Sequence, residues 1–174
     1  MSKSTKKLTL SALFTALSVV LLYLASVMPT GQLGFAALAS LCGVGAVIET
    51  GPRGGLAVYA ASSLLGFLIL PEKTYLLFYV FFFGCYPVIK LMLEKIRSTP
   101  LSWLLKLAVF NAALCVLVFL CSIPVFDIGI LKGRTWLVFI VLNIVFAVYD
   151  LGVTQVIAFY VRRISPHIGK KTGR

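Results

Sequence analysis

Charged side chains are scarce in this sequence, and acidic side chains are the scarcest. Of its 174 residues, 12% are charged and 60% are hydrophobic, with five acidic residues against sixteen basic ones. A soluble domain averages about 25% charged and about 45–50% apolar residues. So high an apolar content excludes intrinsic disorder, and four cysteines are too few for a disulfide scaffold. The composition therefore indicates a polytopic helical membrane protein.

Histidine and paired cysteines are also lacking, which removes most catalytic chemistry. The one histidine, His167, follows the last apolar run, so a Ser–His pair or a histidine-rich metal site cannot form inside the membrane. The cysteines form no CxxC pair, and no phosphate-binding GxxxxGK[ST] motif is present. We therefore expect no enzymatic activity, no metal site and no cofactor.

Six apolar runs are present, separated by proline, glycine and charged residues. A helix needs roughly 20 apolar residues to cross a bilayer. The second and third runs are shorter than this, and the last run is longer. We predict an all-α protein whose residues 1–174 form a single membrane domain of six transmembrane helices, near residues 8–28, 33–48, 55–70, 75–93, 101–121 and 135–161.

Basic residues are distributed unevenly between the two sides that six helices define. If the N-terminus is cytoplasmic, 13 of the 16 Lys and Arg residues lie on the cytoplasmic side and 3 lie outside. The positive-inside rule then predicts that both termini are cytoplasmic, in agreement with an even number of helices. Topology and anionic lipid account for the basic excess, so we expect the lipid bilayer, and no nucleic acid, as a partner. Lys90 and Lys106 lie inside apolar runs near their cytoplasmic ends, and we expect both side chains to snorkel to the headgroups.

Three polar side chains lie deep within the last two predicted helices. A carboxyl near the middle of a helix costs about 2.5–3.5 kcal/mol to insert, so Asp150 should face the bundle interior. Asn143 lies two turns earlier on the same face, and Asn111 lies at a comparable depth in the fifth run. Two interpretations are open: a polar ligand pocket between the helices, or hydrogen-bonded ties worth about 0.6 kcal/mol each, with Asp150 as a possible partner of Asn111.

Aromatic residues gather in the fourth run, and charged residues gather in the outer segment 122–134. Tyr79 lies about one turn inside the interfacial Tyr75 and could stack on a flat ligand, although general packing also explains such a cluster. The segment 122–134 ends in Arg134 and could cap a pocket or act as a solvated connector. Tyr79 and Arg134 are therefore candidates for ligand contact, although neither belongs to a known ligand-binding motif.

The first apolar run contains small residues at helical spacing, and these residues are part of a resemblance to a known family. Ala12 and Ala16 lie four residues apart in the stretch Lys6-Lys-Leu-Thr-Leu-Ser-Ala-Leu-Phe-Thr-Ala-Leu, and such pairs allow close helix approach. A short chain with six spans, both termini inside and a basic start leading into an alanine motif resembles the substrate-binding S components of energy-coupling factor (ECF) transporters. The resemblance implies that Ala12 and Ala16 dock onto a transmembrane T component, which associates with two cytoplasmic ABC ATPases.

The resemblance also implies a ligand site near the outer face, built mainly from the fourth to sixth helices and the outer loops. On this analogy the substrate-binding candidates are Tyr79, Asn111, Asn143, Asp150, Gln32 and Arg134. The expected function is capture of a small, vitamin-like nutrient at the cytoplasmic membrane, with energy supplied by the partner ATPases. Two alternatives stay open: a self-sufficient secondary transporter or channel that uses Asp150, and a membrane scaffold without a ligand.

Overall fold

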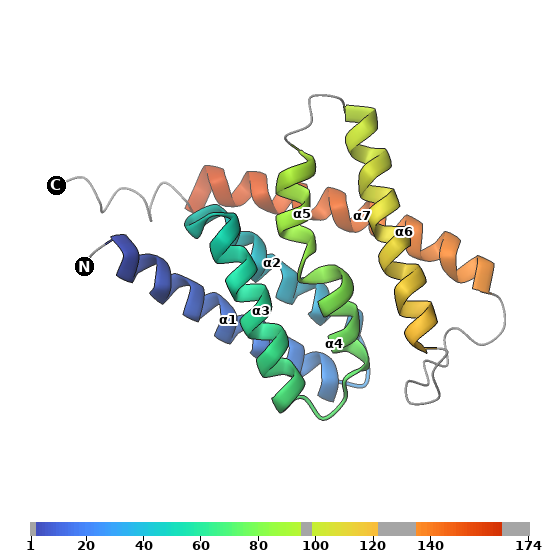
Figure 1. Ribbon diagram of the computed structural model, residues 1–174, viewed down its shortest axis with the longest axis horizontal. Helices are drawn as coiled ribbons and strands as arrows, with labels where there is room; N and C mark the ends of the chain where they lie inside the picture. The colour runs from blue at the N-terminus through green and yellow to red at the C-terminus, as the bar shows by residue number, and fades with distance from the viewer. Residues whose placement is uncertain (1–2, 95–98, 122–134, 165–174) are drawn as a thin grey trace.

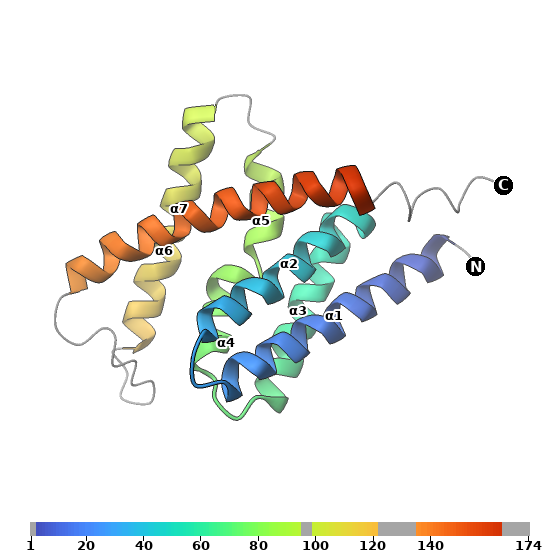
Figure 2. The same ribbon diagram turned by 180° about the vertical axis from the view of Figure 1, so that it is seen from behind.

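The computed structural model describes residues 3–94, 99–121 and 135–164, and every regular element within these ranges is helical. Figures 1 and 2 show the helices from two opposite sides. In chain order they are α1 Lys3–Val27, α2 Gln32–Thr50, α3 Pro52–Ile69, α4 Thr74–Phe78, the π-helix η1 Tyr79–Phe83, α5 Tyr86–Leu93, α6 Thr99–Cys121, α7 Thr135–Phe159 and the π-helix η3 Tyr160–Ile164.

Six helical segments are long and apolar enough to cross a membrane, which confirms the predicted all-α architecture with six transmembrane helices. They are Ser4–Val27, Gln32–Thr50, Pro52–Ile69, Thr74–Leu93, Pro100–Leu117 and Phe139–Arg162. The second and third segments are longer than the sequence indicated, because only Gly51 separates them. Gly51 has φ = 89°, a conformation that glycine adopts without steric cost, and Pro52 then starts α3.

The helix ends lie at two opposite ends of the bundle. In Figure 1, α1 begins, α2 meets α3 and α7 ends on the left side, and α5 ends toward the top. The junction of α1 with α2 lies below and to the right of these ends, and α7 begins at the right. The first of these ends carries Lys6, Lys7, Arg53 and Arg162, and we refer to it as the basic end. The prediction that this end is cytoplasmic follows from the positive-inside rule.

The first three helices pack closely through small residues. Six alanine, glycine and serine residues of α2 are buried: Ala36, Ala39, Ser40, Gly43, Gly45 and Ala46. A Cβ atom on Gly45 would come within 2.8 Å of the Phe14 ring of α1, so the two helices approach as far as backbone allows. The small-residue faces of α2 therefore serve packing inside the chain, as membrane helices commonly do.

The fourth membrane segment is not a continuous α-helix. The amide of Gly84 donates to the Tyr79 carbonyl at 2.7 Å, a π-type bond that ends η1, and Pro87 lies in the first turn of α5. The Tyr59 hydroxyl of α3 donates to the Val80 carbonyl at 2.9 Å. A Cβ on Gly84 would come within 2.5 Å of the Tyr59 ring, so glycine is required at this break.

Candidate functional site

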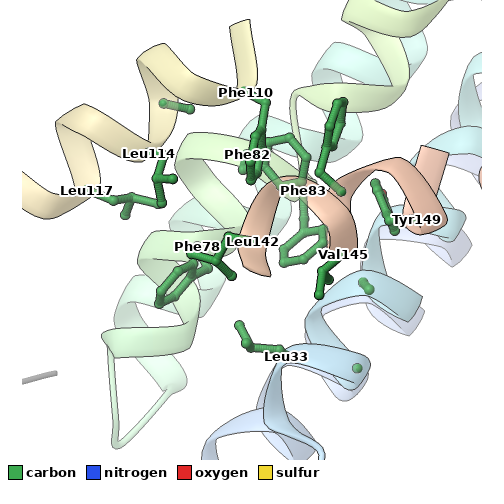
Figure 3. A pocket seen from close by; sticks show the side chains of 14 residues that line it. Leu33, Phe78, Phe82, Phe83, Phe110, Leu114, Leu117, Leu142, Val145 and Tyr149 are labelled. Carbon is green, nitrogen blue, oxygen red and sulfur yellow. The ribbon is translucent and has the colours of Figure 1, made fainter. Parts of the chain in front are cut away.

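An apolar cavity of about 200 Å³ lies between α2, the α4–η1 segment, α6 and α7. Figure 3 shows side chains from these four elements arranged around it. Its aromatic wall consists of Phe78, Phe82, Phe83, Phe110, Phe146 and Tyr149, and small residues of α2 and α6 widen it at Gly34, Ala37 and Ala113. Because the cavity uses the start of α2 and the second half of α6, it lies toward the end of the bundle opposite the basic end.

The aromatic side chains of the cavity wall support one another. The rings of Phe110 and Phe146 stack with centroids 4.5 Å apart and an interplanar angle of 6°. Phe82 meets both rings edge-on, at 4.9 Å and 5.6 Å. Such pairs add about 0.5–1.5 kcal/mol each beyond their buried area. The wall is therefore preformed by packing inside the protein.

Asn111 and Asn143 bind each other rather than lining the cavity. The Asn111 side-chain amide donates to the Asn143 side-chain oxygen at 2.9 Å, and the reverse bond is 3.1 Å long. Each amide also donates to a carbonyl of its own helix, Leu107 for Asn111 and Phe139 for Asn143. All four amide hydrogens are thereby used, so this pair fits the interpretation as a tie between α6 and α7.

Two further sequence candidates, Tyr79 and Gln32, also lie outside the cavity wall. Tyr79 is buried against α3, where its hydroxyl is 2.8 Å from the Ser62 hydroxyl. Gln32 is the first residue of α2 and is half-buried, whereas its neighbours Leu33 and Gly34 line the cavity. Arg134 lies outside the described residues.

Asp150 is the centre of a buried charge cluster that consists of Lys90, Glu94, Lys106 and Asp150. Its carboxylate accepts from the Lys90 ammonium and the Tyr86 hydroxyl at one oxygen, and from Lys106 at the other at 3.1 Å. Glu94 lies 3.0 Å from Lys90 and 3.2 Å from Lys106. Two cations thus face two carboxylates, and the cluster ties α5, α6 and α7 together.

This geometry corrects two expectations from the sequence. Lys90 and Lys106 do not snorkel to the headgroups, since their side chains are only 1% and 5% exposed and point to Asp150. Asp150 faces the bundle interior, as its insertion cost demands, but it binds these lysines and not Asn111. Part of the cluster could have been predicted from the sequence, because Lys90 and Glu94 lie four residues apart and can pair on one helix.

A second space, of about 280 Å³, borders the charge cluster. Its lining includes Ser102, Trp103 and Thr154 together with three members of the cluster. Thr154 accepts a bond from Lys90 at 2.9 Å and donates to the Asp150 carbonyl at 2.8 Å. The polar groups of this space are therefore largely used in holding the helices.

Tyr149 places its ring in the cavity wall and its hydroxyl against α2. The hydroxyl lies 2.5 Å from the Ser40 hydroxyl, and Ser40 donates its only proton to the Ala37 carbonyl at 2.6 Å. Tyr149 must therefore be the donor to Ser40. This bond joins α7 to α2 and turns the one hydroxyl of the wall away from the cavity.

Ala12 and Ala16 lie on an exposed face of α1. Leu8, Leu13 and Leu17 share this face and are 73%, 63% and 49% exposed. The opposite face of α1 packs on α2 and α3 through residues such as Ser18 and Leu22. Within the described residues, the alanine pair is therefore accessible to lipid or to a partner helix.

Comparisons of the chain with protein-family models, with curated proteins and with solved structures found no match. The function is therefore argued from the cavity, the charge cluster and the exposed face of α1. Of these, the cavity has the features of a small-molecule site: it is concave, apolar, rich in aromatic rings and bounded by rigid helices.

Proposed function

We propose that this chain is the substrate-capture subunit of an ECF-type importer. It binds a small molecule in the cavity, and a transmembrane T component with two cytoplasmic ABC ATPases supplies the energy for release inside. The observation that carries the proposal is the preformed cavity between four helices, away from the basic end. With the basic end in the cytoplasm, as the positive-inside rule predicts, the cavity faces the side from which an importer takes its substrate.

The exposed face of α1 supports the docking part of the proposal. Ala12 and Ala16 have no side chain beyond Cβ, so a partner helix can approach the α1 backbone closely at this face. Both alanines are exposed, whereas the small residues of α2 are already covered by the rest of the bundle. An exposed pair of alanines on an apolar helix face is suited to contact with a partner helix.

The arrangement around Asp150 disfavours the alternative of a self-sufficient transporter. A proton or cation site needs a carboxylate that can accept the transported ion. Both oxygens of Asp150 already accept from lysine ammonium groups, and Tyr86 adds a further donor. An additional cation at this place would meet two positive charges, so Asp150 is suited to holding helices rather than to carrying ions.

Affinity purification of the tagged full-length chain from its host in mild detergent tests the proposal. We expect a larger membrane protein and two ABC ATPases to co-purify with it. Ala12→Trp and Ala16→Trp should each reduce this recovery severalfold, because the indole ring separates the two helix backbones. The matched control is Ala112→Trp, an exposed alanine on α6, which lies on the other side of the bundle from α1.

Two outcomes would count against the proposal. If no ATPase is recovered in any mild detergent, the chain works without the ECF machinery. If uptake into liposomes that contain this chain alone is driven by an ion gradient and lost in Asp150→Asn, the secondary-transporter alternative holds. Recovery of the ATPases with the Ala112→Trp variant, but not with the two α1 variants, would support docking through α1.

A further inference from the structure

We propose that the cavity selects an uncharged, hydrophobic ligand, or part of a ligand, that carries one or two fused rings. The inference rests on the proposed function in one respect, namely that the cavity is the ligand site. It differs from the expectation of a polar pocket, in which asparagine and aspartate side chains would hold the ligand. The side chains of Asn111, Asn143 and Asp150, which could serve in such a pocket, bind other groups of the protein.

Among the described residues, the side-chain hydrogen-bonding groups in and beside the cavity wall bind other protein groups. The Tyr149 hydroxyl donates to Ser40, and the Tyr86 hydroxyl donates to Asp150. The amides of Asn111 and Asn143 bind each other and their own helices. What remains for a ligand is a wall of rings and aliphatic side chains. A polar group that enters this space loses its hydration without a replacement partner, which is unfavourable for a neutral group and more so for an ion.

The buried charges that the structure describes in α5, α6 and α7 offer no compensation either. Lys90, Lys106, Glu94 and Asp150 balance one another as two cations and two anions in direct contact. The rings of Tyr86 and Phe146, with centroids 5.6 Å apart, belong to the aromatic cluster beside the cavity, and the Tyr86 hydroxyl reaches the charge cluster. Within residues 3–94, 99–121 and 135–164, a charged ligand in the cavity would therefore meet no free counter-ion among the residues that line it.

The volume and the aromatic wall of the cavity indicate how large the ligand is and that it carries a ring. An apolar cavity of about 150 Å³ in a protein core accommodates benzene, so about 200 Å³ is suited to a substituted ring or a compact bicycle. Phe82, Phe110 and Phe146 line the cavity and pack on one another at aromatic distances. A ligand ring in this wall can add aromatic contacts, which contribute beyond the buried area.

Gly34 allows the cavity to be filled without disturbing the fold. A Cβ atom on Gly34 would have no neighbour within 4 Å, and Gly34 lines the cavity within α2. We expect Gly34→Leu to fold normally and to occupy part of the ligand space. Gly152→Leu is the matched control, because Gly152 lies in open space on α7 and does not line the cavity.

The test uses three probes that share one ring system and differ in charge: indole, indole-3-acetate and tryptamine. Equilibrium dialysis with the purified full-length chain in detergent measures each affinity, with empty micelles subtracted. We expect indole to bind, the anion and the cation to bind at least tenfold more weakly, and Gly34→Leu to lower indole affinity at least tenfold. Gly152→Leu should bind indole as the unmodified chain does.

The outcomes separate the two proposals. If a charged probe binds as tightly as indole and Gly34→Leu removes that binding, the cavity is the site but the ligand class is wrong. If indole binding is absent, or is the same in Gly34→Leu, the cavity is not a site for this class and the inference fails. Co-purification of the ATPases is measured independently, so failure of the proposed transport role is seen in that experiment and not in this one.

Discussion

The two halves of the bundle are held together by different means. The first three helices pack through buried alanine, glycine and serine side chains, and their backbones approach closely. The last two membrane segments carry large side chains, and hydrogen bonds and ion pairs hold them at a few points. Asn111 binds Asn143 between α6 and α7, Tyr149 binds Ser40 of α2, and Asp150 binds Lys90 of α5 and Lys106 of α6. The cavity lies where the second type of packing leaves room.

This difference shows what each type of contact permits. Where small residues are in continuous contact, as between α1 and α2, no space is left for a ligand. Two helices packed in this way behave as one rigid unit. Isolated polar ties fix the relative position of α5, α6 and α7 and let the helices diverge between the ties. In lipid there is no hydrophobic force between helices, so the polar ties and the aromatic contacts of the wall are what hold these helices around the cavity.

The largest effect should come from breaking the charge cluster. Asp150→Ala leaves Lys90 and Lys106 buried with only the half-exposed Glu94 as a counter-ion. Removing one partner of a buried ion pair typically costs about 3–5 kcal/mol. We expect a loss of this size in the free energy of unfolding, measured by thermal unfolding of the purified protein in detergent.

A triple variant separates the charge effect from loss of packing. Because an apolar replacement of a whole buried ion cluster is often neutral, Asp150→Leu combined with Lys90→Met and Lys106→Met should recover most of the lost stability. A triple variant as unstable as Asp150→Ala would show that the cluster is not the element that holds α5, α6 and α7.

The next effect should come from the break in the fourth segment. Gly84→Ala places a Cβ atom against the Tyr59 and Tyr79 rings, at 2.5 Å and 2.9 Å before relaxation. Overpacking of this kind costs about 1–3 kcal/mol. The matched control, Gly152→Ala, should be neutral or gain up to about 1 kcal/mol, since alanine is the better helix former. Equal unfolding temperatures for the two variants would mean that the close approach at Gly84 is not required.

The sequence predicted the helices well, because hydropathy depends on each segment separately. It also placed Asp150 in the interior correctly, since a membrane carboxyl has no other stable environment. Its error at Lys90 and Lys106 has a physical cause: a lysine near a helix end can reach the headgroups or an internal acid, and the choice depends on where other helices place that acid. Asp150 lies 60 and 44 residues away from these lysines along the chain.

The cavity could not be predicted from residue types alone. Its wall is made of phenylalanine and leucine side chains that look in the sequence like ordinary packing or lipid-facing residues. The space arises from the interrupted fourth segment and from the crossing of α6 and α7, which only the assembled helices define. Of the polar residues that the sequence singled out, Asn111, Asn143 and Asp150 form ties between helices. Tyr149, which lines the cavity, was not singled out.

The smallest effect, and the sharpest test of this division of roles, is expected at the asparagine tie. Asn111→Leu and Asn143→Leu each remove both interhelical bonds, and such bonds contribute about 0.6 kcal/mol on average. Each single variant leaves one amide with no partner on the other helix, so the double variant should be no less stable than either single one. If the pair is a tie only, the affinity for indole in equilibrium dialysis should change less than twofold in all three variants. A tenfold loss of affinity with unchanged thermal stability would instead mean that these amides contact the ligand, and would restore the polar pocket that the sequence suggested.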